Sequence, residues 1–150
     1  MTGEGRLPHR TLLAWTCDSD LPTRRARQLL RPALRSLGAT EDLVEDGVLM
    51  ATEAVANATL HADGPYLLRL RHSSFEALIE VHDRTLYRPR LAPAETHLPH
   101  QKDDPDTHGR GLLIIHRLSQ GCWGFRTYPG HKVCWFAIPL EGSRADNPSG

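Results

Sequence analysis

Three polar side chains recur at intervals of four residues in an otherwise apolar segment: Glu53, Asn57 and His61. At about 3.6 residues per turn, this spacing puts all three on one face of a helix. A carboxylate can serve as a general base, and an amide oxygen can serve as a ligand of Mg²⁺, which otherwise takes phosphates and water. Alanines flank Asn57, so another group can approach it closely. A solvated stripe on an amphipathic helix has the same pattern, and this segment alone leaves both interpretations open.

Asp83 is a second candidate, because it directly follows the alternating segment 77–82, which is typical of a strand. A carboxylate at the end of an apolar strand can accept a hydrogen bond from the exocyclic amine of a nucleobase. It can equally cap the turn that follows the strand. The residue by itself does not decide between binding and capping.

A third candidate is the sequence Gly109-Arg110-Gly111, which precedes an apolar segment that begins at Leu112. Two glycines permit the close approach of another group to the backbone. Free N–H groups at the start of a helix bind anions, and a guanidinium suits phosphate oxygens. A plain turn before a helix explains the same residues, so this signal is also open.

The elements that must position these residues follow from the spacing of apolar side chains. It predicts a helix over 21–37, which Pro32 should kink or split, and a helix from Thr40 to about His61. A short helix is expected over 112–118. The expected strands are 11–17, 66–71, 77–82, 121–127 and 132–139. Helices and strands are segregated along the chain, which predicts an α+β fold, a two-layer α/β sandwich with a mixed or mostly antiparallel sheet and helices on one face.

The segment 84–108 shows no periodicity and contains four prolines, and a loop of this length inside a domain usually has a function. We expect one domain over 11–140, with a flexible arm at 1–10 and a flexible tail at 141–150. A chain of 150 residues is the size of a single domain.

Composition excludes several classes of protein. Lys and Arg total 18 and Asp and Glu total 18, so there is no basic surplus and no direct binding of nucleic acid is expected. No apolar run approaches the roughly 20 residues that span a bilayer, so no membrane association is expected. Three cysteines without a disulfide pattern, and no signal-peptide region at the start, predict a cytoplasmic location.

Taken together and in order, the three candidates resemble the conserved boxes of the GHKL ATP-binding superfamily. Residues 49–62 resemble the N box, 81–83 the G1 box and 109–112 the G2 box. The resemblance covers roughly residues 11–140, and it is closest to the small anti-sigma-factor serine/threonine kinases of the RsbW/SpoIIAB type, in their actinobacterial form. It implies the GHKL (Bergerat) ATPase fold with ATP and Mg²⁺ as cofactors.

The resemblance also implies roles for the residues of the predicted helix. Asn57 would coordinate the Mg²⁺ that bridges the ATP phosphates. Glu53 would be the general base toward the hydroxyl of a protein serine, and His61 would help to close the site. Residues 84–108 would form the ATP lid.

Further roles are implied for the other two boxes. Asp83 would hydrogen-bond the amino group of adenine. Gly109, Arg110 and Gly111 would wrap the phosphates, and Leu112 completes this box at the nucleotide site.

By the same resemblance, the chain would bind a sigma factor or an anti-anti-sigma antagonist with a STAS domain, phosphorylate the antagonist on Ser or Thr, and form a homodimer. Two departures from the family pattern keep an alternative open, a nucleotide-dependent binding module without catalysis. Residues 84–88 follow Asp83 where a fuller G1 box has glycines, and Thr107 stands where the better-known kinases have an arginine. A third possibility is a fold of this kind that binds protein without nucleotide.

Overall fold

The computed structural model describes residues 9–86 and 109–140, which form a sheet covered by helices. The helices are α1 (Pro22–Ser36), α2 (Glu41–His61) and α3 (Gly109–Leu118). The strands are β1 (His9–Trp15), β2 (Tyr66–His72), β3 (Glu76–Asp83), β4 (Trp123–Tyr128) and β5 (His131–Pro139). All neighbouring strands pair antiparallel in the order β1-β2-β3-β5-β4.

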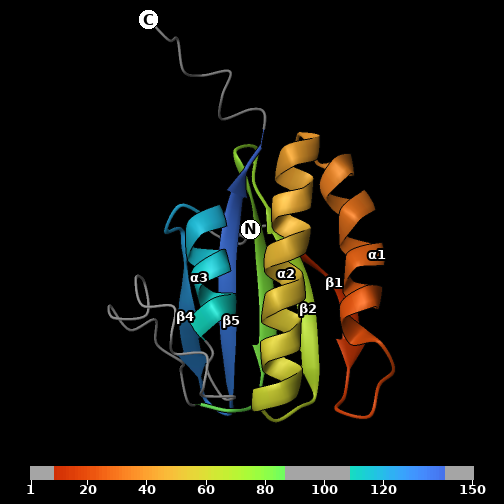
Figure 1. The fold of residues 1–150 in the computed structure, drawn as a ribbon, viewed down its shortest axis with the longest axis vertical. Coiled ribbons are helices and arrows are strands. Elements are labelled where there is room, and N and C mark those ends of the chain that lie inside the picture. The colour runs from red at the N-terminus through yellow and green to blue at the C-terminus, as the bar shows by residue number, and fades with distance from the viewer. Residues whose placement is uncertain (1–8, 87–108, 141–150) are drawn as a thin grey trace, which may run out of the picture.

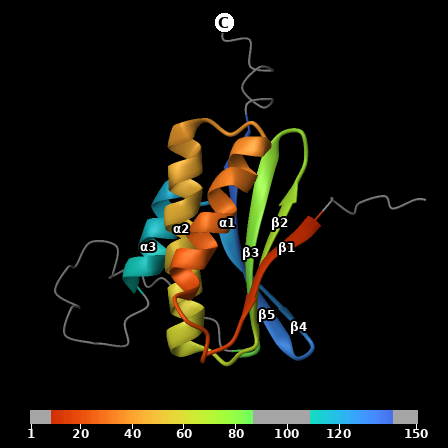
Figure 2. The same cartoon turned by 90° about the vertical axis from the view of Figure 1, so that its right-hand side faces the viewer.

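The three helices lie on one face of this sheet, as Figures 1 and 2 show from two sides. The predicted α+β two-layer sandwich is therefore confirmed, with a sheet that is antiparallel throughout the described residues. In β3 every second residue is buried under the helices, namely Ala77, Ile79 and Val81. This alternation is what a strand with one covered face requires.

Close packing at Gly47 sets the position of α2 in the layer of helices. A Cβ atom at this residue would lie 2.8 Å from Cδ1 of Leu34 on α1 and 3.4 Å from Cδ1 of Ile79 on β3. A side chain here would therefore require Leu34 to move. Glycine here allows α2 to lie directly on the centre of the sheet.

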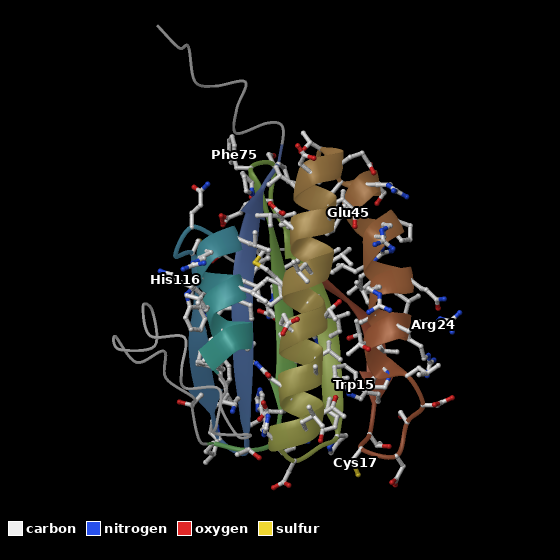
Figure 3. All side chains as sticks on the ribbon, in the orientation of Figure 1. Trp15, Cys17, Arg24, Glu45, Phe75 and His116 are labelled. Carbon is white, nitrogen blue, oxygen red and sulfur yellow. The ribbon has the colours of Figure 1, made fainter. Side chains whose placement is uncertain are left out.

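Helix α2 has the predicted bounds, and both of its ends are fixed by hydrogen bonds. At its start, the hydroxyl of Thr40 accepts a hydrogen bond from the backbone N–H of Leu43 at 3.3 Å, as a capping residue should. Near its end, the indole of Trp15 donates to the hydroxyl of Thr59 at 2.9 Å, and Figure 3 shows Trp15 beside this half of α2. The hydroxyl of Tyr66 donates to the carbonyl of Ala62 at 2.6 Å. The half of α2 that carries the predicted site is thus fixed to the sheet.

Helix α1 is continuous across Pro32, so of the two predicted effects, a kink or a split, the split does not occur. Proline has no N–H, so the carbonyl of Gln28 loses its partner within the helix. Both Pro32 and Gln28 are exposed, so water can take the place of the missing donor. The cost of the proline is therefore small enough for the helix to continue.

Helix α3 begins at Gly109, almost one turn before the predicted start at Leu112. Residues 109–111 are thus the first turn of the helix and do not form a loop in front of it. The predicted helix over 112–118 did not include these residues, and glycine is a weak helix former. In a first turn the N–H groups lack helical partners in any case, so glycine costs less there.

The remaining boundaries can be compared only in part. β1 begins at His9, within the last residues of the segment expected to be an arm. Residues 1–8, most of the expected lid (87–108, with Thr107) and the expected tail (141–150) lie outside the described residues.

Candidate functional site

The three segments singled out in the sequence meet in the lower half of the molecule as drawn in Figure 1. They are the C-terminal half of α2, the end of β3 and the start of α3. A small pocket opens between them, with a cavity volume of about 30 Å³. Small-molecule sites commonly measure roughly 300–1,000 Å³, so a nucleotide would have to widen this pocket. The lining residues are Ala54, Asn57, Ala58 and His61 from α2, Ala62 directly after it, Val81 and Asp83 from β3, Thr85 shortly after β3, Leu112 and Ile115 from α3, Phe125 from β4, and Lys132 and Cys134 from β5.

Two helices touch at one side of this pocket, at a contact made by Glu53, Asn57 and Gly111. A Cβ atom on Gly111 would lie 2.8 Å from Nδ2 of Asn57 and 3.3 Å from Oε1 of Glu53. The first turn of α3 therefore lies directly against the two polar side chains of α2. We name these three residues the α2–α3 contact. Sequence positions more than fifty residues apart are brought together here, as the motif order implied.

The other predicted site residues lie around this contact. His61 and Leu112 both line the pocket. His61 is exposed, whereas Leu112 is fully buried and packs into the core. Gly109 and Arg110 form the start of α3. Glu53 does not line the pocket itself and reaches it through the α2–α3 contact.

Asp83 lies on the sheet side of the pocket, and only 5% of its surface is exposed. Its Oδ1 accepts a hydrogen bond from the backbone N–H of Thr85 at 2.8 Å, and its Oδ2 lies 3.5 Å from Nζ of Lys132. Burial raises the pKa of the Asp83 carboxyl above its usual value, although the hydrogen bond from Thr85 and the charge of Lys132 act in the opposite direction. The carboxylate is thus a fixed acceptor in a poorly hydrated place.

The segment after β3 is held in a way that orients this carboxylate. The N–H of Arg84 donates to the carbonyl of Asp63 at 2.8 Å, and the hydroxyl of Thr85 accepts from the N–H of Asp63 at 2.8 Å. Arg84 also donates from Nη1 to the carbonyl of Gly130 at 3.3 Å. These bonds connect the end of β3 to the α2–β2 loop and to the β4–β5 turn, and they hold Thr85 where it can donate to Asp83.

Lys132 and Cys134 are pocket residues that the sequence analysis did not identify. Lys132 is only 3% exposed, and its ammonium also lies 5.4 Å from the ring centre of Phe125. Cys134 is buried beside it, and burial raises the pKa of its thiol to about 12. With Val81 and Asp83 they form the sheet side of the pocket, which we name the pocket floor. Lys132 could have been identified only from the pairing of β3 with β5, because that pairing places it opposite Asp83.

The chemistry of the pocket is divided between its two sides. Apolar side chains of α2, α3 and the sheet enclose a buried acceptor and a buried cation, which suits a flat heteroaromatic ring that carries polar groups on one edge. An amide, a carboxylate and the start of a helix meet at the α2–α3 contact, which suits an anion and its cation. Within residues 9–86 and 109–140, no group of three or more His, Cys, Asp or Glu side chains is arranged to hold a metal ion. In the same part of the chain, no helix has the length and apolar character needed to cross a membrane.

Comparison with protein families gives one result that bears on this site. The sequence profile of the histidine kinase-like ATPase domain matches residues 19–136, which span α1 to β5 and include every residue of the α2–α3 contact and the pocket floor. No curated protein matches the chain significantly.

Proposed function

The chain belongs to the histidine kinase-like ATPase domain family, and from this premise we propose that it is an anti-sigma-factor-like serine/threonine protein kinase. Membership of the family implies that ATP is the ligand of the pocket. The observation that carries the proposal is the convergence of Glu53, Asn57 and Gly111 beside a pocket whose floor holds the buried Asp83. This arrangement supports the roles of base, cation ligand and acceptor that we propose for these residues.

The residues present fit a nucleotide with Mg²⁺. Asp83 would offer an acceptor to the amino group of adenine, and Ala54, Ala58 and Leu112 give the pocket apolar walls. Asn57 offers an amide oxygen to Mg²⁺, an ion that needs only one or two protein ligands when phosphates and water supply the others. Gly111, which carries no side chain, allows the phosphates to approach the backbone of the first turn of α3.

Bound Mg-ATP supplies the γ-phosphoryl group, and the residues of the chain position it and move one proton. Glu53 accepts the proton that the serine hydroxyl of the antagonist loses as its oxygen bonds to the phosphorus atom and ADP leaves. The half-buried carboxylate of Glu53 faces the first turn of α3, where the phosphates are expected. Catalysis of this kind rests on positioning and on neutralising charge.

The expected partners are a sigma factor and a STAS-domain antagonist, and the chain would act as a homodimer. Support for these partners comes from the resemblance of the three motifs to the anti-sigma-factor kinases. In this reading, phosphorylation of the antagonist frees the kinase to hold the sigma factor, so that transcription follows the state of the antagonist.

A nucleotide-dependent binding module without catalysis is the second candidate, and the tight α2–α3 contact favours it. Because Gly111 packs against the Asn57 amide, a Mg²⁺ ion held by Asn57 would lie next to the first turn of α3. Binding of ATP would then change the surface around α3 even if no phosphoryl group were transferred.

The decisive experiment combines Mg-ATP binding with transfer of labelled γ-phosphate to a purified STAS-domain antagonist. Wild type should bind and transfer; Glu53→Gln should bind ATP with nearly unchanged affinity and lose transfer; Asn57→Ala should lose both. Equal transfer by wild type and both variants would reject the assigned roles. Binding of ATP by wild type without transfer would favour the second candidate, and no binding would leave a fold that binds only protein.

A further inference from the structure

One face of the sheet is turned away from the three helices, as Figure 2 shows, and a second cavity lies on this face. In β3, Val81 is buried under the helices, so the next residue, His82, points to the other face. Pairing of the strands sets Leu67 beside His82 and Ala14 beside Leu67, and these three residues line the cavity. Its volume of about 390 Å³ lies within the range of small-molecule sites, roughly 300–1,000 Å³. We name it the open-face hollow.

Basic side chains from three strands and one loop border the open-face hollow. They are Arg69 of β2, His82 of β3, Arg84 directly after β3 and His131 of β5. The whole chain has 18 Lys and Arg against 18 Asp and Glu, so this accumulation does not follow from composition. Asp83 also borders the hollow, but its carboxylate is held at the ATP pocket by Thr85 and Lys132. The hollow is therefore suited to an anion.

Each arginine is held by one hydrogen bond and keeps further donors for a ligand. Nε of Arg69 donates to the hydroxyl of Thr11 at 3.3 Å, and Nη1 of Arg84 donates to the carbonyl of Gly130 at 3.3 Å. Within residues 9–86 and 109–140, the remaining nitrogen atoms of these two guanidinium groups make no hydrogen bond. The planar fork of a guanidinium matches the oxygens of a phosphate or a carboxylate.

Two imidazole rings give the hollow a flat side. Oε1 of Glu80 lies 3.1 Å from Nε2 of His82, and Glu80 is only 5% exposed, so a buried carboxylate fixes this ring. Oε2 of Glu80 lies 3.3 Å from Nε of Arg71, so both oxygens of this carboxylate face a basic group. The ring of His131 stacks on that of His82, with centres 5.7 Å apart and planes 13° apart. Stacked rings beside the apolar Leu67 suit a flat, apolar group.

We propose that the open-face hollow binds a small organic phosphate, a monoester with a flat apolar body. The guanidinium groups of Arg69 and Arg84 meet its charge, and the two imidazole rings and Leu67 contact its body. A phosphate monoester carries a charge of about −1.5 to −2 near pH 7 and three acceptor oxygens, which match two arginines with spare N–H groups better than the single charge of a carboxylate does. This proposal goes beyond the ATP site, because the hollow lies on the opposite face of the sheet.

The test uses phenyl phosphate, which joins a flat ring to a phosphate, and follows the N–H signals of ¹⁵N-labelled protein by NMR during a titration. Phenyl phosphate should shift the signals of residues 67–69 and 82–84. Benzoate lacks the second charge and inorganic phosphate lacks the ring, so each should bind about tenfold more weakly. Benzoate that binds as tightly as phenyl phosphate would overturn the assignment to phosphate.

A matched pair of variants tests the arginines. Arg69→Gln removes the charge but keeps a polar side chain, and it should weaken binding of phenyl phosphate about tenfold. Arg126→Gln removes an exposed arginine of β4 that does not line the hollow, and it should bind phenyl phosphate as wild type does. Equal losses in the two variants would show attraction by general surface charge and would overturn the proposal.

The titration of wild type decides the location without any variant. If the signals of residues 67–69 and 82–84 do not shift, or if the shifts are confined to the first turn of α3, the open-face hollow is not a phosphate site and the proposal is wrong. A failure of wild type to bind Mg-ATP would instead contradict the proposed function. That failure leaves this proposal standing, because phenyl phosphate is detected on the other face of the sheet.

Discussion

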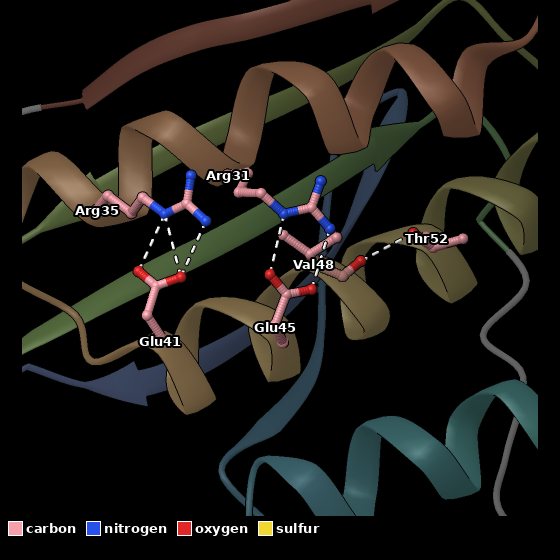
Figure 4. Close-up of polar contacts among 6 residues, drawn as sticks. All are labelled: Arg31, Arg35, Glu41, Glu45, Val48 and Thr52. Carbon is pink, nitrogen blue, oxygen red and sulfur yellow. Dashed lines mark hydrogen bonds and ion pairs between the residues drawn. The ribbon is translucent and has the colours of Figure 1, made fainter.

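The protein contains two sets of ion pairs that differ in what they do. Between α1 and α2, Arg31 pairs with Glu45 at 3.0 Å and Arg35 pairs with Glu41 at 2.9 Å, each through more than one hydrogen bond (Figure 4). On the pocket floor, Lys132 and Asp83 are farther apart, at 3.5 Å. Judged by distance, the surface pairs would matter more.

Burial reverses that order. The surface carboxylates stay hydrated with or without their arginines, and salt screens the attraction between them. Hydrogen bonds from the arginines lower the pKa of Glu41 and Glu45, yet all four side chains remain in contact with water. On the pocket floor both groups are buried, so water does not solvate them as it solvates the surface pairs. We therefore expect ligand binding to depend on the longer pair.

The largest expected effect is that of Asp83→Asn. The change replaces the carboxylate that would accept from the base and that pairs with the buried Lys132. We expect affinity for Mg-ATP to fall about a hundredfold. Isothermal titration measures this affinity. Asp20→Asn, at an exposed carboxylate, is the matched control, and an equal response of both variants would contradict the contrast between surface and floor.

Gly111→Ala should have the next largest effect, and on binding alone. Its Cβ would lie 2.8 Å from Nδ2 of Asn57, so the amide must turn aside. A short side chain can move at little cost, and alanine favours helix over glycine, so the free energy of unfolding should change by less than about 1 kcal/mol. Affinity for Mg-ATP should nevertheless fall about tenfold. If Gly111→Ala binds Mg-ATP with the affinity of wild type, the α2–α3 contact is not part of the binding site.

A pH series gives a smaller effect with a definite sign. The folded pKa of Asp83 is raised by burial, so its carboxylate is lost at a higher pH than that of an ordinary aspartate. Affinity for ATP should therefore decline on acidification at a higher pH than the one at which exposed aspartates titrate. The contribution of Asp83 to folding has the opposite sign: because its folded pKa exceeds the unfolded one, stability decreases as pH rises between the two values. In Asp83→Asn, the pH dependence that Asp83 contributes to ATP affinity and to stability should disappear. If the substitution leaves the pH dependence unchanged, other groups cause it.

The smallest effect is expected on the surface. Glu45→Gln and Glu41→Gln should leave Tm within experimental scatter at physiological ionic strength and leave ATP binding unchanged, because these groups are hydrated in either state. Thermal denaturation at low and high salt measures the change. A loss comparable to that of Asp83→Asn would show that short distance outweighs burial, contrary to the comparison above.

Local patterns in the sequence were enough for much of the fold and for part of the site. The spacing of Glu53, Asn57 and His61 predicted one helix face, and α2 runs between the expected ends because Thr40 caps it as its chemistry requires. The alternation in 77–82 predicted β3 with Asp83 at its end. Each of these features depends on neighbours within a few residues.

Other features depend on partners that are distant in the chain. Lys132 was expected only as a strand residue, since its burial follows from β5 pairing with β3 and from the helices above them. Gly109 is part of α3 although glycine has a low helix propensity, and the first turn of this helix packs on α2. Pro32 lies within α1, on a side of the helix that faces water. Tertiary contacts and exposure decide such cases, and a single sequence does not state them.

The burial of Cys134 beside the pocket makes it possible to measure how often the pocket opens to water. Cys17, at the lower end of the molecule in Figure 3, and Cys122 are exposed, whereas Cys134 is buried with a thiol whose pKa is about 12. Alkylating reagents attack thiolates, so iodoacetamide should modify the first two cysteines at once. It reaches Cys134 only in molecules whose floor has opened to water. The rate of the slow phase of labelling would therefore report how often the floor opens. A compound that fills the pocket should make this rate lower.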